Sequence, residues 1–230
     1  MSEKKSSGSI YRIMDFARVV ELFNTNELYF ASPSEWDDPY EKRGIPLNGG
    51  GVFAQCWCQL AASDAMWRIY SQHGMGVRIS TFPTKLEEQV TAGVMNDGLK
   101  WRGGPVAYLP QFKLDEECRA LAGRLRQDSK AKHAVEMLYM KREAFQHESE
   151  WRATIYHPVK QGRRGGNGIK VRVDAHDLVN RILLDPRAPD ALIDAFKFYF
   201  EKKLKFKGRV GRSVLYRSPD PIDFDDEEDV

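Results

Sequence analysis

The chain has 230 residues, of which 42% are hydrophobic and 30% charged, and this composition suits one packed domain with a sizeable core. Five Trp and twelve Phe residues exclude a disordered or low-complexity protein. No apolar stretch approaches the roughly 20 residues of a membrane helix. The polar start, Met1 to Gly8, lacks the apolar core of a secretory signal. We therefore expect a cytoplasmic protein with no membrane partner.

The cysteines argue against a disulfide framework and against a resident metal. There are three, Cys56, Cys58 and Cys118, and their number and spacing suit neither paired disulfides nor a zinc site with four ligands. The sequence also lacks a helical pairing of His with acidic residues and an Asp-rich ligand loop. We expect no metal site.

The net charge of +2 conceals an asymmetry between the body and the end of the chain. The last twelve residues, Pro219 to Val230, hold seven acids and no base. Without them, 35 basic residues face 26 acidic ones, a net charge of +9. Such a body attracts phosphate backbones, whereas the acidic tail either solvates the terminus, folds back on the basic surface or binds a partner.

The first half of the chain alternates short apolar stretches with helical periodicities. The predicted strands cover residues 9–13, 27–32, 52–58 and 76–80. The predicted helices cover residues 16–23 and 85–95, with a short helix between them that begins near residue 64 and ends at His73-Gly74. Ser63 or Asp64 is the expected N-cap of the second helix, which carries Trp67 and Tyr70. Residues 33–41 are expected to form a rigid, turn-rich loop.

The second half begins with a weak strand and a long helical stretch. Its predicted elements are a strand at 106–108, helix over 114–145 broken near 128–129, strands at 151–156, 169–173 and 179–184, a helix at 189–200 and a closing strand at 214–216. We expect the strands at 151–156 and 169–173 to form a hairpin with a long basic tip.

These elements predict an α+β fold in which helices flank a mixed, largely antiparallel sheet. We expect a single domain over residues 10–218, between a disordered lead at 1–9 and an acidic disordered tail at 219–230.

Five short motifs resemble, in the same order, a widespread prokaryotic domain of unknown function. They are Tyr11-Arg12, the loop from Trp36 to Glu41, Cys56-Trp57-Cys58, the stretch from Met66 to Tyr70 followed by Gly76-Val77, and the stretch from His147 to Arg152. The chain departs from the family pattern at two positions. Asp37 stands where the family has Asn, and Cys58 stands where it has Ser. The resemblance covers residues 10–218 and implies no settled activity.

The layout of these motifs is similar to that of ADP-ribosyltransferases, which cleave the nicotinamide bond of NAD. The resemblance implies a fold of that type and NAD as substrate. Glu150 would stabilise the oxocarbenium-like ribose, and Glu148, two residues earlier on the same strand face, would orient or deprotonate the acceptor. Arg12 would clamp the pyrophosphate, and Trp67 or Tyr70 would stack on nicotinamide.

The same residues also have structural interpretations, which the sequence leaves open. Glu148, Glu150 and Arg152 on one strand face also match a salt-bridge ladder. Trp67 and Tyr70, three residues apart on a short helix, also match core packing. A catalytic and a structural role are about equally supported for the glutamates.

We expect an ADP-ribosyltransferase-like enzyme that modifies a macromolecule, with RNA favoured over DNA. Such an activity in a bacterial cytoplasm implies a toxin or anti-phage effector restrained by an antitoxin protein. The alternative is a non-enzymatic module that binds nucleic acid or an acidic protein. Its basic residues would be Lys160, Arg163, Arg164 and Lys170, together with residues 197–212.

Overall fold

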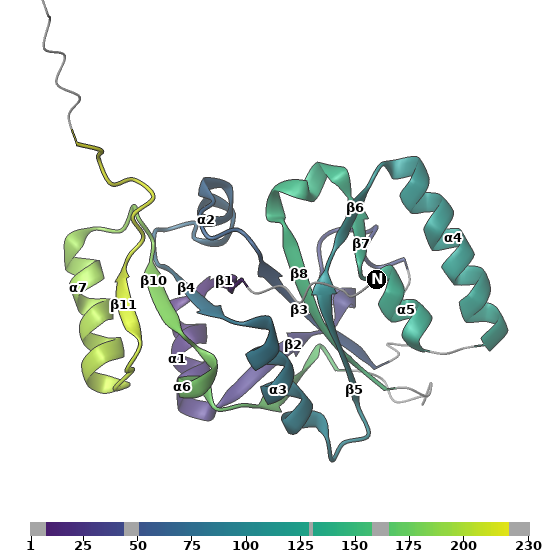
Figure 1. Cartoon of the computed structure of the whole chain (residues 1–230), viewed down its shortest axis with the longest axis horizontal. Helices are drawn as coiled ribbons and strands as arrows, with labels where there is room; N and C mark the ends of the chain where they lie inside the picture. The colour runs from purple at the N-terminus through teal and green to yellow at the C-terminus, as the bar shows by residue number, and fades with distance from the viewer. Residues whose placement is uncertain (1–7, 44–50, 129–130, 158–165, 221–230) are drawn as a thin grey trace, which may run out of the picture.

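The structure is a computed structural model that describes residues 8–43, 51–128, 131–157 and 166–220 (Figure 1). Nine strands form the main sheet. Its path runs through β11 (Arg209–Arg212), β10 (Arg181–Leu184), β4 (Gly76–Thr81), β1 (Ile10–Asp15), β3 (Val52–Cys58), β2 (Glu27–Ala31) and β9 (Gly168–Arg172). The other two strands are β8 (Glu150–Tyr156), which pairs with β3, and β5 (Lys100–Pro105), which pairs with β8. Among the described strand pairs of this main sheet, β10 and β11 are parallel and the others are antiparallel.

One face of this sheet carries the main hydrophobic core. The helices that contribute to it are α1 (Phe16–Thr25), α3 (Pro83–Val94), α6 (Ala175–Leu178) and α7 (Asp190–Phe198), the last continued by a π-helical turn at Tyr199–Lys203. On β4, Val77 and Ile79 enter this core, so the alternation of the strand sends Arg78 and Ser80 to the opposite face. The short helix α2 (Asp64–Tyr70) lies on that opposite face, where Trp67 meets Arg78.

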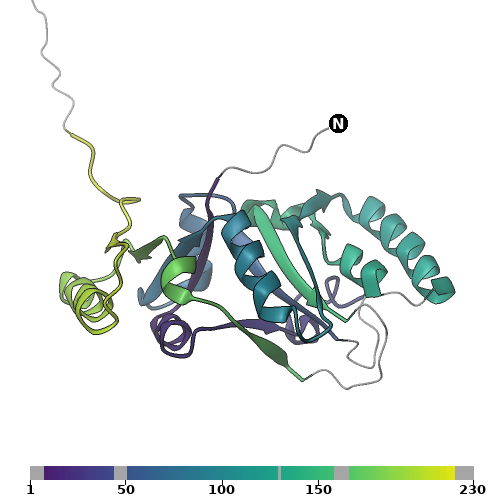
Figure 2. The same ribbon diagram turned by 60° about the horizontal axis from the view of Figure 1, so that its bottom comes forward.

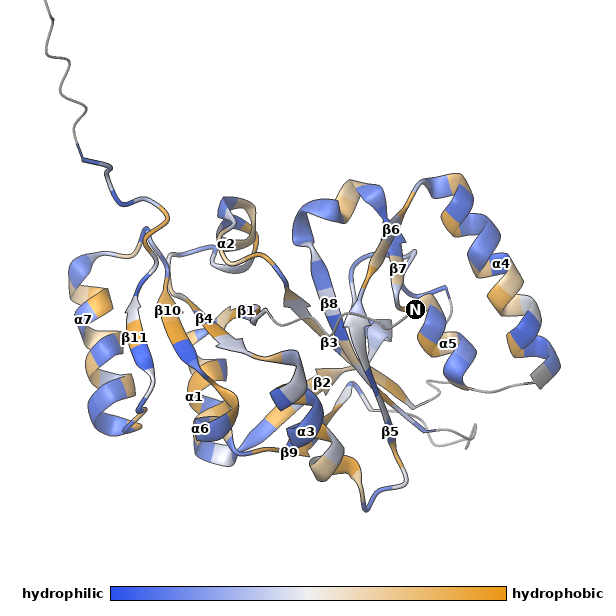
Figure 3. Cartoon of the chain, in the orientation of Figure 1, coloured by the Kyte–Doolittle hydropathy of each residue, from blue (hydrophilic) through white to orange (hydrophobic). Residues whose placement is uncertain are grey.

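A second group of elements packs beside β3 and β8. The strands β6 (Ala107–Leu109) and β7 (Met140–Arg142) pair in parallel, next to the helices α4 (Gln111–Asp128) and α5 (Ala131–Met137). Two 3₁₀ turns, η1 (Pro33–Glu35) and η2 (Glu143–Glu148), complete the described elements. α4 and α7 lie at opposite ends of the molecule in both ribbon views (Figures 1 and 2). α4, at the outer edge, carries mostly polar residues (Figure 3).

Local chemistry explains the boundaries of the elements near the pocket. The Ser63 hydroxyl accepts a hydrogen bond from the Met66 N–H, as predicted for the N-cap of α2. α1 buries Val19, Leu22 and Phe23 on one side and ends at Asn26, which adopts the left-handed conformation.

The structure confirms the predicted α+β class with a mixed, largely antiparallel sheet. Three local predictions are wrong. β8 and β9 do not form a hairpin, because β8 pairs with β3 and β5 while β9 pairs with β2. The helix expected up to residue 145 ends at Met137, and β7 and η2 follow it. The closing strand is β11 rather than residues 214–216. No helix in the described ranges is both long and apolar enough to cross a membrane.

Candidate active site

A pocket opens where two strands share one edge of β3. β8 pairs with β3 along its whole length, from Val52 to Cys58. On the other edge, the described residues pair at two points: β1 meets β3 at Tyr11 and Cys58, and β2 meets it at Ala31 and Ala54. Between these two bridges β1 and β2 diverge, and a cavity of about 470 Å³ lies there. This volume is within the usual range for small-molecule sites.

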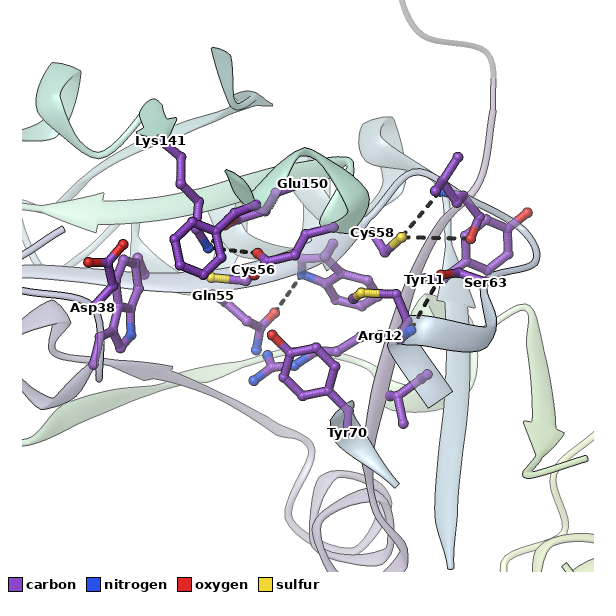
Figure 4. A pocket seen from close by; sticks show the side chains of 18 of the residues that line it. Tyr11, Arg12, Asp38, Gln55, Cys56, Cys58, Ser63, Tyr70, Lys141 and Glu150 are labelled. Carbon is purple, nitrogen blue, oxygen red and sulfur yellow. Dashed lines mark hydrogen bonds and ion pairs between the residues drawn. The ribbon is translucent and has the colours of Figure 1, made fainter. Parts of the chain in front are cut away.

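The five residues predicted for catalysis and NAD binding all line this pocket. They are Arg12, Trp67, Tyr70, Glu148 and Glu150. Figure 4 shows Arg12 beside Tyr70 on one side and Lys141 with Glu150 on the other. The structure therefore brings these residues together from four separate elements, β1, α2, η2 and β8, although their chemical roles stay predictions.

A buried ion-pair network forms the carboxylate side of the pocket. The guanidinium of Arg152 is fully buried and donates to both oxygens of Glu150, at 2.5 and 2.7 Å. It also donates to Glu41 at 2.5 Å and stacks on the ring of Trp36, 4.6 Å from the ring centroid. Burial raises the pKa of Glu150, but Arg152 and Lys141 outweigh burial, so the pKa lies below its ordinary value. Glu150 is therefore a fixed anion.

Lys141 joins three carboxylates of the same network. Its ammonium lies 2.6 Å from Glu148, 3.4 Å from Glu41 and 3.6 Å from Glu150. The three carboxylates face two cations, Lys141 and Arg152, so one negative charge remains in excess. Burial raises the pKa of Glu148 above its ordinary value, despite the hydrogen bond from Lys141. Glu148 is thus the member of the network suited to exchange a proton.

Glu148 lines the pocket from a different element than the strand on which it was predicted. It is the last residue of η2, and Ser149 has a φ of 41° before β8 begins at Glu150. The expectation that Glu148 and Glu150 share a strand face is therefore wrong. Glu150 and Arg152 do share that face, so the predicted salt bridge between them is present and buried.

The other side of the pocket holds two arginines without a carboxylate partner among the described residues. No hydrogen bond or ion pair within the described ranges engages the Arg12 guanidinium, and burial lowers the pKa of Arg12. Arg78 donates to the carbonyl oxygen of Ala61 and lies over the rings of Tyr11 and Trp67, at 4.7 and 5.8 Å. Arg12 is half-buried and Arg78 is buried, and cations in such places without a counter-ion favour an anionic ligand.

The two predicted stacking residues differ in exposure. Trp67 is 1% exposed and forms part of the wall beneath Arg78. Tyr70 is 45% exposed and presents its ring at the pocket beside Arg12 (Figure 4). Burial and the charge of Glu148 raise the pKa of Tyr70, so the phenol stays neutral. Tyr70 is thus the better placed of the two to stack on a ligand.

The cysteines of β3 are not activated nucleophiles. Burial and the charge of Glu150 raise the pKa of Cys56 well above its ordinary value. The thiol of Cys58 accepts a hydrogen bond from the Leu60 N–H at 3.3 Å and holds the loop that leaves β3. Cys58, which stands where the resembled family has Ser, thus serves loop geometry here. Within the described ranges, no cluster of His, Cys, Asp and Glu has the arrangement of a metal site.

Of the four basic residues predicted to bind nucleic acid, the structure describes Lys170. Lys160, Arg163 and Arg164 lie outside the described residues. Lys170, on β9, contacts Glu21 at 2.9 Å and Glu27 at 3.4 Å, so two acids match its charge.

Three residues that line the site were not singled out from the sequence. They are Gln55, Arg78 and Lys141. Glu41 was singled out, because the acids of the Trp36-to-Glu41 motif could line a pocket, and it does line this one. Lys141 had no signal, because its strand follows a stretch of helical periodicity.

Comparisons with known proteins give one family match and several distant structures. A family profile described as a protein of unknown function (DUF2971) matches residues 66–153, a span that contains two of the five motifs. This agrees with the resemblance to a domain of unknown function. The match includes Tyr70, Lys141, Glu148 and Glu150. No curated protein matches the chain significantly.

Three of the similar solved structures are of one protein, Thermus sp. 2.9 DarT, at 11% sequence identity in each case. Its complex with NAD+ has a TM-score of 0.44 and covers 90% of this chain and 96% of that chain. The complex with carba-NAD+ has a TM-score of 0.42, with coverage of 93% and 97%. The complex with ADP-ribosylated ssDNA has a TM-score of 0.43, with coverage of 89% and 93%.

Proposed function

We propose that this chain is an ADP-ribosyltransferase-like enzyme that cleaves NAD and transfers ADP-ribose to a macromolecule. The observation that carries the proposal is the division of charge across one pocket. On one side, Arg12 and Arg78 have no carboxylate partner in the described part of the chain, and a network with one excess negative charge occupies the other side. NAD has the complementary distribution, with an anionic pyrophosphate and a cationic nicotinamide riboside.

Each side of the pocket has a distinct chemical task. The guanidinium of Arg12 binds the pyrophosphate, and Tyr70 stacks beside it. Glu150, ionised and held by Arg152, stabilises the positive charge that develops on the ribose as the C–N bond to nicotinamide breaks. The electron pair of that bond leaves with the nicotinamide nitrogen. Arg152 acts through Glu150 and is a positioning residue.

Glu148 completes the transfer. The acceptor atom forms a bond to the anomeric carbon and loses its proton, which Glu148 accepts. A carboxylate with a raised pKa suits this task because it binds a proton more readily than an ordinary glutamate. Lys141, 2.6 Å away, holds Glu148 in place beside Glu150.

The acceptor in this proposal is a nucleic acid, with RNA favoured. The net charge of +9 over the chain before Pro219 supports a polyanionic target. Uncontrolled modification of nucleic acid would be toxic to the cell that makes the enzyme. The proposed biological role is therefore a bacterial toxin or anti-phage effector with a protein antitoxin.

The proposal is tested by Glu150→Gln, with Glu87→Gln on the exposed surface of α3 as the matched control. Nicotinamide release from NAD should fall about 100- to 1,000-fold in Glu150→Gln and stay unchanged in the control, because the amide cannot stabilise a developing cation. Binding of NAD, measured by calorimetry, should persist in both. Nicotinamide release at the wild-type rate in Glu150→Gln would overturn the catalytic role. A wild-type protein that does not bind NAD would overturn the function itself.

A non-enzymatic nucleic-acid module is the second candidate. It is favoured by the exposed bases that follow α7, which are Lys202, Lys203, Lys205, Lys207 and Arg209. The aromatic side chains of residues 197–212, which could stack on bases, support it less: Phe198 is 57% exposed, but Phe206 is buried in the core. This candidate predicts nucleic-acid binding without NAD binding, so the calorimetry above separates the two functions.

A further inference from the structure

One face of the main sheet carries a row of aligned side chains that is basic at the sheet edge and leads to the pocket. Strand register aligns Arg209 of β11 with Arg181 of β10, Arg181 with Ser80 of β4, and Ser80 with Tyr11 of β1. Tyr11 in turn aligns with Cys58 of β3. Because aligned residues of neighbouring strands point to the same face, these side chains form one continuous row. The row runs from the sheet edge to the pocket, which Tyr11 and Cys58 line.

Arg78 extends the row on the same face. It lies two residues before Ser80 on β4, so it points the same way as Ser80 and is diagonal to Arg181 across the strand pair. Arg78 also lines the pocket. The three arginines, Arg209, Arg181 and Arg78, grade from exposed through half-buried to buried as the row approaches the cavity. We call these three residues the arginine row.

The arginine row has no acidic partner within the described ranges. No ion pair there includes Arg78, Arg181 or Arg209, and the Nε of Arg181 is buried without a hydrogen-bond partner. Like charges directly opposite each other on neighbouring strands destabilise a sheet, as with Arg181 and Arg209. Burial lowers the pKa of Arg78, and the charge of Arg181 lowers it further. A bound polyanion would relieve this repulsion.

We propose that the arginine row is the docking surface for the phosphate backbone of a single-stranded nucleic acid whose end or loop enters the pocket. This rests on the proposed function, for which it supplies the path of the acceptor. Backbone phosphates match a row of cations, since charge-assisted hydrogen bonds to guanidinium fix register without reading sequence. A single strand is required because Glu150 is only 2% exposed, and the target nucleotide must leave its stack to reach it.

The test compares Arg181→Gln/Arg209→Gln with the control Lys202→Gln/Lys203→Gln, both in the full chain. Each variant removes two positive charges from the same end of the molecule, but only the first removes them from the arginine row. Binding of 12-nucleotide oligo(U) and oligo(dT) is measured by fluorescence anisotropy across a salt series. The row variant should lower the slope of log affinity against log salt by about 1.4, from two lost single-strand contacts. The control should retain the wild-type slope.

Parallel measurements separate this proposal from the function on which it rests. Thermal unfolding checks that the row variant is folded, and NAD binding and nicotinamide release without nucleic acid should be unchanged in it. If the slope of log affinity against log salt fell equally in both double variants, the docking surface would be overturned, because the attraction would then be diffuse. Unchanged binding in the row variant would overturn it as well. If the row variant behaves as expected but wild type does not bind NAD, the docking surface stands and the enzymatic function fails. Equal affinity for the two oligonucleotides would indicate recognition of phosphate alone.

Discussion

The two sides of the pocket hold arginines in opposite environments. On the carboxylate side, Arg152 is fully buried and donates to Glu150 and Glu41. On the other side, Arg12 has no acceptor within the described part of the chain. Both belong to the same sheet and line or support the same cavity, so burial alone does not explain the difference.

The difference indicates that the charges on one side stabilise the fold, whereas those on the other side bind a ligand. A buried ion pair is strongly destabilised when one partner is removed, because the other stays buried and uncompensated. A buried cation without a partner destabilises the free protein by its desolvation energy. A bound anion compensates for that energy. Substitutions on the two sides should therefore affect stability and binding in opposite proportions.

The largest effect is expected for Arg152→Met. It leaves Glu150 and Glu41 buried beside Lys141 as the one remaining cation of the network, so the free energy of unfolding should fall by about 3–5 kcal/mol. Urea denaturation measures it. Arg68→Met, which breaks an exposed pair with Asp64 on α2, is the control and should change little. A small effect at Arg152 would mean that the network is not structural.

Arg12→Met should show the reverse pattern. Removing a cation without a partner should leave the unfolding free energy unchanged or raise it, whereas NAD binding should weaken about 10- to 150-fold with the loss of charge-assisted hydrogen bonds. Calorimetry with NAD and urea denaturation measure the two quantities. Arg12→Lys keeps the charge but not the two-pronged geometry and should fall between. A large loss of stability in Arg12→Met would show that Arg12, like Arg152, stabilises the fold.

The pH dependence should distinguish the two glutamates. Burial raises the pKa of Glu148, so transfer to the acceptor should fall as the pH drops through a value above that of an ordinary glutamate. The lowered pKa of Glu150 affects folding at a lower pH: its stabilising contribution is present at neutral pH and is lost as the pH falls through that lowered value. Profiles of ADP-ribose transfer and of unfolding free energy measure these effects. In Glu148→Gln, the fall in ADP-ribose transfer at acidic pH should disappear, whereas the loss of unfolding free energy at low pH should remain.

Much of the fold was predictable because its strands and helices follow simple periodicities. Elements such as β3, β4 and α1 matched their apolar patterns. β5 did not, since Lys100–Pro105 contains two glycines and a proline and lacks apolar alternation. Strand pairing was not predictable locally: β8 precedes β9 in sequence but pairs with β3, nearly a hundred residues earlier.

The sequence predicted which residues line the site better than it predicted how they are arranged. Residue types suited to NAD chemistry identified Arg12 and Glu150, which do line one pocket. The network that fixes Glu150 depends on Glu41 and Lys141, which are a hundred positions apart and meet only through the sheet. Short-range spacing placed Glu148 on the strand, whereas the left-handed Ser149 places it on the preceding turn.

The smallest effect is expected for Lys170→Gln. Lys170 is a predicted nucleic-acid contact, but Glu21 and Glu27 already match its charge on an exposed strand. An exposed ion pair adds little to stability, so the urea midpoint should not move measurably. Because the lysine must leave two carboxylates to bind a phosphate, the salt slope of oligonucleotide binding should also stay at its wild-type value. A slope reduced as much as in the arginine-row variant would place β9 in the nucleic-acid surface and extend that surface across the whole sheet.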